Sequence, residues 1–341
     1  MKDSQLHQAE VFTRRNRAIT CNLCWNRCEI GEDEMGLCNT RVNKHGSLYT
    51  LTYGNLSALE SRPIELKPFH HFLPSSTSMT FSTYSCNLKC PWCQNRHISR
   101  KPPSRQYDRI EPREVVDAAL GAALGEKDPS ICASFNEPTL LFEYLLDLFP
   151  LAAKNGLKNT MVSNGYMMPQ PLKRLIEGGM DAINFDIKNE RSCYHGGSTE
   201  ISKVWRNVKY AVKEGVHVEV VKLLVTGIDD NRQTIEEVIE DHLTYAGSEV
   251  PLHFTRYFPA FMYQEPPTRV DVLENAVKTA REKGVEFAYI GNVSGHKYEN
   301  TYCPQCSELL IHRHSHNILQ NKIQDGKCPQ CRKTLYGIWN R

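Results

Sequence analysis

Over residues 79–290, stretches whose hydrophobic pattern is typical of strands alternate with stretches whose pattern is typical of helices. Short apolar runs of strand-like composition are each followed by a longer stretch whose apolar positions recur at helical spacing. The runs that predict strands are 79–84, 130–135, 159–164, 181–187, 216–225, 251–258 and 285–290. The stretches that predict helices are 112–125, 139–154, 170–178, 200–214, 231–245 and 270–284. Strict alternation of strand and helix predicts an α/β fold with a parallel sheet and right-handed crossovers.

The number of repeats narrows this architecture further. Six predicted helices between seven predicted strands are too few for a closed eightfold barrel, so a (β/α)6 partial barrel fits better. Residues 47–54 alternate as a half-buried strand does, and the proline-rich stretch 62–74 is a connector into the barrel. We therefore predict an N-terminal cysteine-rich segment with its connector, a barrel and a C-terminal segment, at 1–74, 75–295 and 296–341.

Composition is that of an ordinary globular protein. Hydrophobic residues make up 40% and charged residues 23% of the 341 residues. A net charge of +2 gives no support for bulk nucleic-acid binding. The first residues lack the apolar core of a signal peptide, and no apolar run is long enough to span a bilayer. These features predict a soluble cytoplasmic protein without a membrane partner.

Thirteen cysteines change this picture, because eleven of them fall into three groups. Grouped cysteines in a chain of this size indicate metal sites rather than disulfides. Cys132 and Cys193 stand apart from the groups. Cys132 lies within a predicted strand and is expected to be a small core residue, whereas Cys193 follows the fourth strand on the expected active-site face.

The central group has the spacing C-x3-C-x2-C at Cys86, Cys90 and Cys93. Three thiolates in one short loop can bind three irons of a [4Fe–4S] cluster and leave the fourth iron open for chemistry. Zinc is the alternative, but zinc sites generally use four ligands in C-x2-C pairs. The x3 gap and the missing fourth ligand therefore favour the iron–sulfur cluster.

The terminal groups each hold four cysteines. Cys21, Cys24, Cys28 and Cys38 can close a tetrahedral zinc site or hold a fully ligated second Fe–S cluster, and their distance in sequence from the central loop favours zinc. The C-terminal group forms two C-P-x-C knuckles typical of a zinc ribbon, at Cys303, Cys306, Cys328 and Cys331. Histidines 312, 314 and 316 between the knuckles are alternative ligands, but four thiolates leave them as a solvated face.

Polar residues stand at the carboxyl ends of the predicted strands, where the chemistry of such a fold gathers. Each has an ordinary structural explanation: Glu137 as an acid in a first helical turn, Asn164 in a turn, and Asp186 with Lys188 as a surface ion pair. Their shared register along successive strand ends favours one site. The residues are Asn136, Glu137, Ser163, Asn164, Asp186, Lys188, Thr226 and His253.

The central loop, residues 86–93, resembles the cluster loop of the radical S-adenosylmethionine (SAM) superfamily. The wider layout resembles the radical SAM member of the AmmeMemoRadiSam system, a family related to pyruvate formate-lyase activating enzymes. The resemblance runs from Cys21 to Trp339, with landmarks at the N-terminal cysteines, 86–95, 136–138, 163–165, 253–256, 289–293 and the paired knuckles. Two departures weaken its substrate and partner assignments: Ser85 replaces the usual glycine, and residues 61–68 differ from the usual Asp-Pro-Ile-Glu-Lys-Lys-Pro.

The resemblance implies roles for these residues. Trp92 would pack near the adenine, Glu137 would hold the SAM ammonium, and Lys188 would meet the SAM carboxylate. Asn136, Ser163, Asn164, Asp186, Thr226 and His253 would complete the SAM site, and Cys193 is a candidate catalytic thiol that acts after radical formation. The implied cofactors are a [4Fe–4S] cluster and SAM, with zinc added by the C-terminal knuckles.

The implied activity is reductive cleavage of SAM to a 5′-deoxyadenosyl radical that abstracts hydrogen from a substrate. We expect a macromolecular substrate, a protein rather than RNA, as for glycyl-radical-enzyme activases. The implied partners are an electron donor such as flavodoxin or ferredoxin, together with Memo-like and AMMECR-like proteins. Direct modification of a peptide, an RNA or a small metabolite is the alternative reaction, and a non-catalytic metal-bound adaptor or RNA-binding protein is the alternative of another class.

Overall fold

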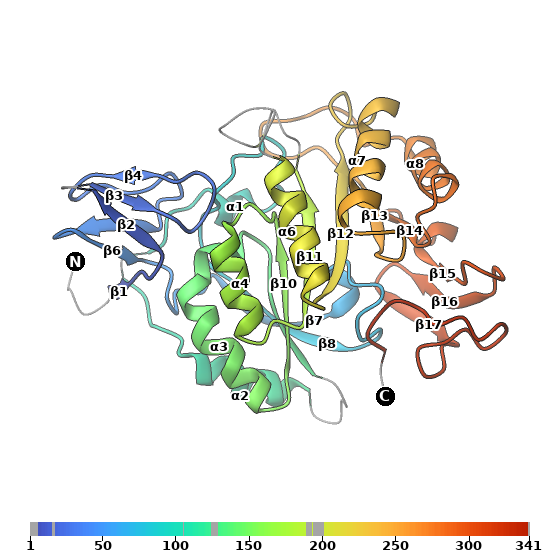
Figure 1. Cartoon of the computed structure of the whole chain (residues 1–341), viewed down its shortest axis with the longest axis horizontal. Helices are drawn as coiled ribbons and strands as arrows, with labels where there is room; N and C mark the ends of the chain where they lie inside the picture. Colours follow the sequence, from blue (N-terminus) through green and yellow to red (C-terminus); the bar gives the residue numbers. More distant parts are fainter. Residues whose placement is uncertain are drawn as a thin grey trace.

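The computed structural model describes residues 6–15, 18–104, 106–123, 129–188, 193 and 201–339. Three regions follow one another along the long axis of the molecule: small N-terminal sheets, a large central sheet with its helices, and a small C-terminal sheet (Figure 1). No helix in these ranges is long and apolar enough to cross a membrane.

The central sheet has eight strands in the order β14-β13-β12-β11-β10-β9-β8-β7. Every neighbouring pair from β8 to β14 is parallel, and β7 joins β8 antiparallel. This confirms the predicted α/β class and its mostly parallel sheet. The strands are β7 (Ala58–Pro63), β8 (Thr77–Ser82), β9 (Ser130–Ala133), β10 (Lys158–Ser163), β11 (Ala182–Ile187), β12 (His217–Leu224), β13 (Leu252–Arg256) and β14 (Ala288–Gly291).

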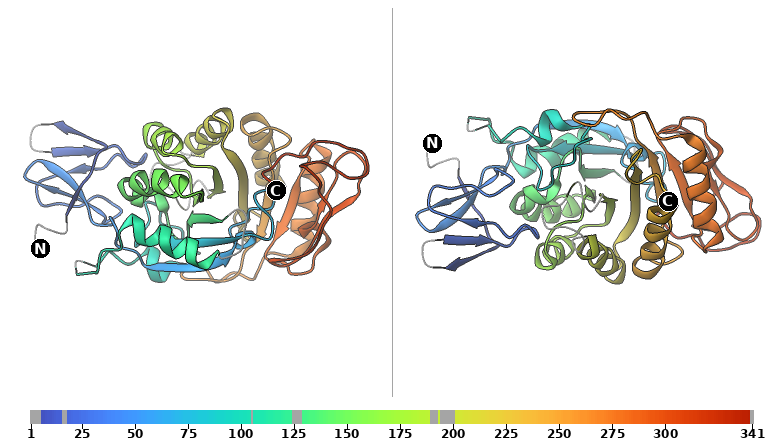
Figure 2. Two further views of the ribbon diagram at one scale, coloured as in Figure 1. Left: turned by 90° about the horizontal axis from the view of Figure 1, so that it is seen from below. Right: turned by 90° about the horizontal axis from the view of Figure 1, so that it is seen from above.

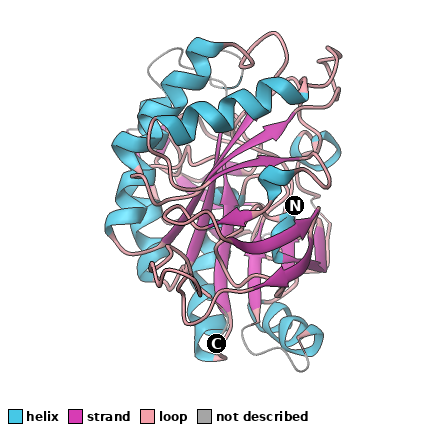
Figure 3. Ribbon diagram, turned by 90° about the vertical axis from the view of Figure 1, so that its right-hand side faces the viewer, coloured by secondary structure: helices cyan, strands magenta, loops and turns pink. Residues whose placement is uncertain are grey.

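One strand of this sheet is absent from the sequence prediction. β7 lies where the proline-rich connector was expected to begin, and its residues are half-buried or exposed. It can include Pro63 because a strand at the edge of a sheet does not need every N–H group for pairing. The twist of the strands from one edge to the other is visible in Figure 3.

Helices cover the outer face of the curved sheet (Figure 2). Consecutive helices contact one another in chain order, as right-handed crossovers require. α2 begins where Pro112 takes the first turn and Glu111 and Glu114 form a capping box. The helices are α2 (Pro112–Ala122), α3 (Phe142–Lys154), α4 (Pro169–Glu177), α6 (Ile201–Lys213), α7 (Arg232–Tyr245) and α8 (Val270–Glu282), with the short α1 (Arg96–Ser99) after the central cysteine loop.

The N-terminal region holds two three-stranded sheets, and the predicted strand at 47–54 is observed over 47–50. Their strands are β1 (His7–Gln8), β6 (Ser47–Thr50) and β5 (Arg41–Lys44), then β2 (Phe12–Arg15), β3 (Ala18–Cys21) and β4 (Glu29–Ile30). The C-terminal sheet consists of β15 (Thr301–Tyr302), β16 (Leu309–His314) and β17 (Asn317–Asn321).

The C-terminal tail returns to the barrel. The Tyr336 hydroxyl accepts a hydrogen bond from the Val218 amide at 2.9 Å, and Ile338 forms a parallel bridge with Phe72. His71 is fully buried between them, with Nδ1 2.6 Å from the Tyr336 carbonyl oxygen and Nε2 2.6 Å from the Tyr289 hydroxyl. The tail is therefore packed as part of the barrel base.

Candidate active site

A cavity of about 320 Å³ opens at the carboxyl ends of the parallel strands. All three cysteines of the central loop line it, as do seven of the nine predicted cofactor residues. Those seven are Trp92, Asn136, Glu137, Ser163, Asn164, Asp186 and Lys188. Parallel strands place their carboxyl ends at one edge, so residues scattered over more than a hundred positions meet there.

The central loop is held in place by backbone ties at Ser85. This residue has a φ of 72°, in the left-handed region that favours glycine, which explains why a glycine suits this position. Its amide donates to the Ile98 carbonyl oxygen at 2.9 Å, and its carbonyl oxygen accepts from Asn136 Nδ2 at 2.7 Å. Its hydroxyl donates to the Cys38 carbonyl oxygen at 2.5 Å. These contacts fix the backbone that precedes Cys86.

The three thiols of the loop differ in their surroundings. Cys86 Sγ accepts from the Leu88 amide at 3.4 Å, and burial raises its pKa. Cys93 Sγ lies 3.0 Å from the Ser99 hydroxyl. A hydrogen bond from the Cys193 thiol lowers the pKa of Cys90. Three thiols that line one cavity could bind three irons of a [4Fe–4S] cluster, as the sequence predicts.

Glu137 is almost completely buried, with an exposed fraction of 1%. Oε1 accepts from the Thr139 amide at 2.9 Å, the Thr139 hydroxyl at 2.5 Å and the Ser163 hydroxyl at 2.8 Å. Oε2 accepts from the Asn164 amide at 2.9 Å. Burial raises the pKa of Glu137, although these hydrogen bonds act in the opposite direction. Within the described structure this carboxylate joins two strand ends, so its predicted contact with a SAM ammonium would come in addition to these four bonds.

Asn164 connects the third strand end to the central loop. Its Nδ2 donates to Asn87 Oδ1 at 2.8 Å and lies 3.8 Å from Cys86 Sγ. Its Oδ1 accepts from the Tyr166 amide at 2.9 Å, which fixes the amide orientation. Asn164 therefore lies against the Cys86 sulfur and lines the cavity at the same time.

Asp186 and Lys188 form an ion pair at the end of β11. Burial alone would lower the pKa of Lys188, but the Asp186 carboxylate and the neighbouring Cys90 outweigh it and raise that pKa. Asp186 Oδ1 is buried and has no hydrogen-bond partner among the described residues. Both residues of the pair line the cavity, and Asp186 keeps Lys188 in its charged form there.

Two predicted cofactor residues do not line the cavity. The Thr226 carbonyl oxygen accepts from the Tyr263 hydroxyl at 2.8 Å, and the Tyr263 ring packs edge-on against Trp92 at 5.7 Å. His253 lies deeper in the barrel, where its Nε2 is 2.7 Å from Glu219 Oε2. Glu219 is also 3.1 Å from His217 Nε2, so His253 belongs to a buried charge cluster rather than to the cavity wall.

Cys193 is buried and lies against the central loop, because its carbonyl oxygen accepts from the Lys89 amide at 3.3 Å. Its thiol donates to Cys90, and that bond raises the pKa of Cys193. The sequence placed it a few residues farther out than the SAM-binding strand ends. The structure places Cys193 next to Cys90 instead, and Cys193 does not line the cavity. Its catalytic role stays a prediction.

Among the cavity residues that were not predicted from the sequence, Lys67 and Phe135 form a contact on the cavity wall. Lys67 is buried, and its Nζ lies 4.1 Å from the centre of the Phe135 ring. Burial lowers the pKa of Lys67, and within the described ranges no carboxylate comes within 4.0 Å of its Nζ. Phe135 has a φ of 68°, and its carbonyl oxygen accepts from Asn95 Nδ2 at 2.6 Å. The altered 61–68 motif was a signal for Lys67, whereas nothing in the sequence marked Phe135.

The C-terminal cysteines converge on one point. The ligand atoms of Cys303, Cys306, Cys328 and Cys331 all lie within 4.8 Å of one another. Sγ–Sγ distances are 3.5 Å for Cys303 with Cys331 and 3.7 Å for Cys306 with Cys328. This four-cysteine cluster can hold a metal ion. The three intervening histidines are exposed, as expected of a solvated face.

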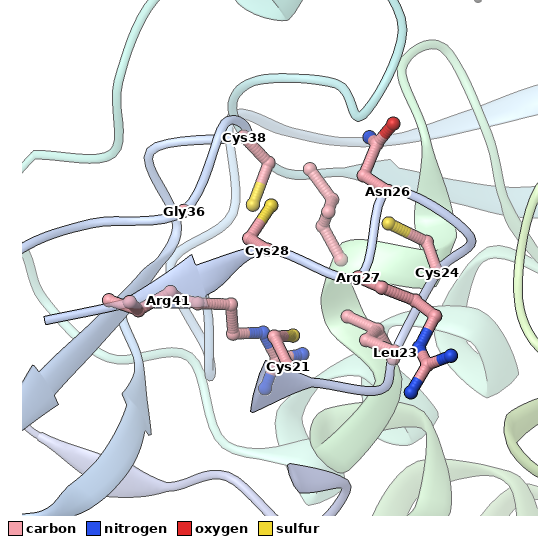
Figure 4. A pocket seen from close by; sticks show the side chains of 11 residues that line it. Cys21, Leu23, Cys24, Asn26, Arg27, Cys28, Gly36, Cys38 and Arg41 are labelled. Atoms are coloured by element: carbon pink, nitrogen blue, oxygen red, sulfur yellow. The ribbon is translucent and has the colours of Figure 1, made fainter. Parts of the chain in front are cut away.

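The N-terminal cysteines line a separate small hollow with Arg41 (Figure 4). The expectation that this segment lies away from the central loop is wrong. Asn26, between two of its cysteines, donates from Nδ2 to the Asn87 carbonyl oxygen at 2.8 Å. The Ser85 hydroxyl, next to Cys86, donates to Cys38. The argument for zinc from remoteness therefore fails, because tertiary contacts cancel the sequence separation.

Comparisons with known proteins give the family and several similar proteins. A family model described as "Radical SAM superfamily" matches residues 80–242. The chain is 38% identical over 302 residues to "Uncharacterized protein MJ0808" of Methanocaldococcus jannaschii, which covers 88% of this chain and 89% of the relative. It is 24% identical over 227 residues to "Putative glycyl-radical enzyme activating enzyme MJ1632" of the same organism, covering 64% and 80%. A solved radical SAM methyltransferase from Sphaerobacter thermophilus aligns with 14% identity and a TM-score of 0.48, covering 89% of this chain and 82% of that chain.

Proposed function

Because this chain belongs to the radical SAM superfamily of enzymes, we propose that it abstracts a hydrogen atom from a protein substrate, as glycyl-radical-enzyme activases do. A [4Fe–4S] cluster with bound SAM supplies the reductive cleavage that makes the adenosyl radical. Cys86, Cys90 and Cys93 would hold three irons of that cluster. The chain's remaining task is to orient SAM and to bring the substrate to the cavity.

The cavity wall offers groups for the polar ends of SAM. Lys188, held in place by Asp186, would bind the SAM carboxylate. Asp186, whose buried Oδ1 has no hydrogen-bond partner among the described residues, would accept from the SAM ammonium if its side chain turned towards the cavity. Asn164 would hold the Cys86 thiolate in position from the other side. Trp92, packed on Tyr263, gives an apolar surface for the adenine. These roles are proposals that the cavity geometry supports.

The observation that carries the substrate class is a second groove beside the cavity. Gln94 lines both, and Arg96, His97, Arg100 and Phe261 line the groove alone. Both arginines lie over the Phe261 ring, at 5.5 Å and 5.8 Å from its centre. A groove of about 470 Å³ that shares Gln94 with the reactive cavity would give a chain too long for the cavity a second place to bind.

The side chains beside the groove and the central loop favour a protein substrate over an RNA substrate. Met262 is 73% exposed and Phe258 is 38% exposed, and the Met262 amide donates to the Pro91 carbonyl oxygen of the central loop at 2.9 Å. Exposed apolar side chains beside a reactive loop suit a protein surface. The adjacent arginines would pair with carboxylates of that surface. The net charge of +2 gives no general attraction for nucleic acid.

The test is anaerobic SAM cleavage with reductant, with cell extract separated by size as the substrate source. We expect the macromolecular fraction, and not the small-molecule fraction, to raise 5′-deoxyadenosine above the uncoupled level. Protease should abolish this stimulation and ribonuclease should not. Met262→Glu should lose the stimulation but keep uncoupled cleavage, whereas Arg232→Glu, on exposed α7, should change neither. Stimulation by the small-molecule fraction alone would contradict the proposal.

Lys67 supports a second candidate, direct modification of a small anionic metabolite. Its amine lies on the cavity wall over Phe135, without a carboxylate from the described residues. Such a group can receive a carboxylate or phosphate of a substrate that enters the cavity completely. Lys67→Met should then raise the KM for that metabolite. An activase consumes about one SAM per protein activated, whereas a modifying enzyme continues to turn over.

The narrower family placement is part of the same proposal. We propose that this enzyme is the radical SAM member of the AmmeMemoRadiSam system, with Memo-like and AMMECR-like partners and a flavodoxin or ferredoxin as electron donor. The landmark motifs support this placement, and the two departures at Ser85 and 61–68 concern the loop backbone and the substrate wall. We further propose zinc at the C-terminal cysteines, whose convergence suits a tetrahedral ion. The predicted domain boundaries and a reducing cytoplasmic setting belong to this proposal as well.

A further inference from the structure

The three cysteine groups of the chain differ in how far apart their sulfurs lie. Zinc binds thiolates at about 2.3 Å, so the sulfurs of a tetrahedral zinc site are about 3.8 Å apart. The C-terminal group matches this spacing, with Sγ–Sγ distances of 3.5 Å and 3.7 Å. A [4Fe–4S] cluster holds its thiolates farther apart, because each is bound to a different corner of the cube.

The N-terminal group does not have zinc spacing. No three of the sulfurs of Cys21, Cys24, Cys28 and Cys38 lie within 4.8 Å of one another, although all four residues are described. The same holds for the central group, whose three cysteines are assigned to a [4Fe–4S] cluster. The N-terminal group and the central group thus both lack the close sulfur spacing that the C-terminal four-cysteine cluster has.

The space between the N-terminal cysteines is open. All four line one small hollow, whose empty centre has about the size of one water molecule. Thiolates gathered 2.3 Å from a zinc ion would leave no such space between them. Figure 4 shows Cys24 on one side of the hollow, Cys28 and Cys38 on the other, and Cys21 beside Arg41.

Arg41 gives an independent indication of an anionic occupant. Its guanidinium lines the hollow and is 1% exposed. NH1 donates to Glu143 Oε1 at 2.6 Å, but Nε and NH2 are buried and have no hydrogen-bond partner among the described residues. Buried donors without partners are costly, so an acceptor in the hollow would satisfy them. The sulfides and thiolates of a cluster are such acceptors.

The hollow is also connected to the central loop by two short routes. On one side, Asn26 donates to the Asn87 carbonyl oxygen, one residue after Cys86. On the other side, the Ser85 hydroxyl, one residue before Cys86, donates to the Cys38 carbonyl oxygen. Each route runs from a cysteine-bearing loop of one site to Cys86 through a single hydrogen bond. A redox centre in the hollow would therefore lie next to the catalytic loop.

We propose that Cys21, Cys24, Cys28 and Cys38 bind a second, fully ligated [4Fe–4S] cluster, which passes electrons to the catalytic cluster. One electron moves from a reduced donor protein of the flavodoxin or ferredoxin class to the N-terminal cluster and then to the catalytic cluster, and no bond or proton is exchanged. The binding of the second cluster stands on its own geometry. Only its electron-relay role rests on the proposed function.

The first test measures metal content in a chain that cannot cleave SAM. A variant with Cys86, Cys90 and Cys93 all changed to Ala, reconstituted anaerobically, should retain about four irons and four sulfides per chain. On reduction it should give a [4Fe–4S] electron paramagnetic resonance signal that SAM does not alter. Wild type should hold about eight irons and one zinc. A variant without iron and with two zinc ions per chain would overturn the proposal.

The second test separates electron entry from cluster binding. Cys24→Ser with Cys28→Ser, in the full chain, should lose about four irons and keep the SAM-sensitive signal of the catalytic cluster. It should cleave SAM with a small chemical reductant such as titanium(III) citrate, but lose cleavage driven by reduced flavodoxin. Equal rates of flavodoxin-driven cleavage in this variant and wild type would overturn the relay. Loss of cleavage with both reductants and of the SAM-sensitive signal would show that the site only supports folding, which also overturns the relay.

Two further variants complete the tests: a control cysteine outside the three groups, and Arg41 beside the hollow. Cys132→Ala removes a buried thiol of β9 and should leave the iron count and both signals unchanged. Arg41→Met removes the unpaired donors beside the hollow, and should shift the reduction potential of the N-terminal signal without changing that of the catalytic signal. An unchanged potential would show that Arg41 does not act on a cluster there.

Discussion

Four cysteines stand near each end of the chain, yet the two ends fold around them in different ways. Each C-terminal knuckle turns back on itself, with Ser307 and Arg332 at φ values of 61° and 63° and amides bonded to the Cys303 and Cys328 carbonyl oxygens. The repeated turn brings four sulfurs to one point. The N-terminal cysteines come from strand β3 and from loops, and surround a hollow. Both ends thus offer four cysteines, and the course of the backbone sets how far apart their sulfurs lie and so which metal centre would fit.

The two ends also differ in what they are attached to. The C-terminal tail is attached to the base of the barrel through Tyr336, His71 and Ile338, far along the strands from the cavity mouth. The N-terminal loops are attached to residues that flank Cys86. A metal centre at the C-terminal end can therefore stabilise the fold, and one at the N-terminal end can act on the catalytic loop.

The largest expected effect comes from the central group. Changing Cys86, Cys90 and Cys93 together to Ala should abolish 5′-deoxyadenosine formation, because no thiolate then holds the catalytic cluster. The C-terminal metal should remain, since its four ligands are untouched. Product analysis and zinc content would be measured beside Cys132→Ala as the matched control. SAM cleavage by the triple variant would refute the assignment of the site.

A large loss of stability is expected from the C-terminal group. Closed thiolate sites contribute their metal-binding free energy to folding, so Cys328→Ser should lower the free energy of unfolding by several kcal/mol. Because Tyr336 and Ile338 are bonded to the barrel, the loss should extend to the barrel base and not stop at the small sheet. Denaturant titration followed by tryptophan fluorescence measures it. His314→Ala, which removes an exposed side chain, should change nothing.

Lys188→Met tests the SAM site itself. It removes a charge-assisted contact worth roughly 1.5–3 kcal/mol, which is about one to two decades of SAM affinity. Calorimetric titration with SAM under anaerobic conditions measures this, and Lys173→Met, at an exposed position of α4, is the control. Unchanged SAM affinity in Lys188→Met would move the carboxylate contact to another residue, with Lys67 as the nearest alternative on the wall.

Acid should weaken the attachment of the C-terminal tail. Burial lowers the pKa of His71 to about 3, so the unfolded chain binds this proton more readily than the folded chain. The stability that neutral His71 contributes is therefore complete above pH 6.5 and is lost as pH falls from about 6.5 towards 3. Between about pH 7 and pH 5 the loss is about 2 kcal/mol for this residue alone. Denaturant titrations should show a shallower pH dependence in His71→Gln, and an identical one would contradict this account.

Much of this structure could be predicted from the sequence, and the exceptions have physical causes. Apolar runs and helical spacing predicted the parallel strands and helices, because buried strands and amphipathic helices leave strong patterns. β7 was missed because Glu60, Ser61 and Arg62 give an exposed edge strand no apolar signal. Strand-end residues were predicted to meet because parallel strands share an edge, but His253 lies three residues before the end of β13 and points into the deeper Glu219 cluster.

What the sequence could not predict was distance between segments. The contacts of Asn26 with Asn87 and of Cys38 with Ser85 join segments 61 and 47 residues apart, and no local pattern announces them. These contacts decide whether the N-terminal cysteines are remote from the catalytic loop. The distance between the sulfurs of the N-terminal and C-terminal cysteines likewise depends on the backbone turns between them. The C-x2-C spacing alone does not determine those turns.

The smallest expected effect tests the contact between the N-terminal region and the central loop. Ser85 has a φ of 72° and donates its hydroxyl to the Cys38 carbonyl oxygen. Ser85→Ala keeps the unfavourable φ and loses this bond, so it should cost about 1 kcal/mol of stability. Ser85→Gly loses the same bond but relieves the left-handed backbone by about 1–2 kcal/mol, less about 0.4–1 kcal/mol for the greater entropy of glycine in the unfolded chain, so the terms should nearly cancel. Thermal unfolding of the pair should therefore rank alanine below glycine, with glycine close to wild type. Equal stability of all three would mean that this bond does not hold the N-terminal region to the loop, and would leave the Asn26–Asn87 hydrogen bond as a side-chain tie between them.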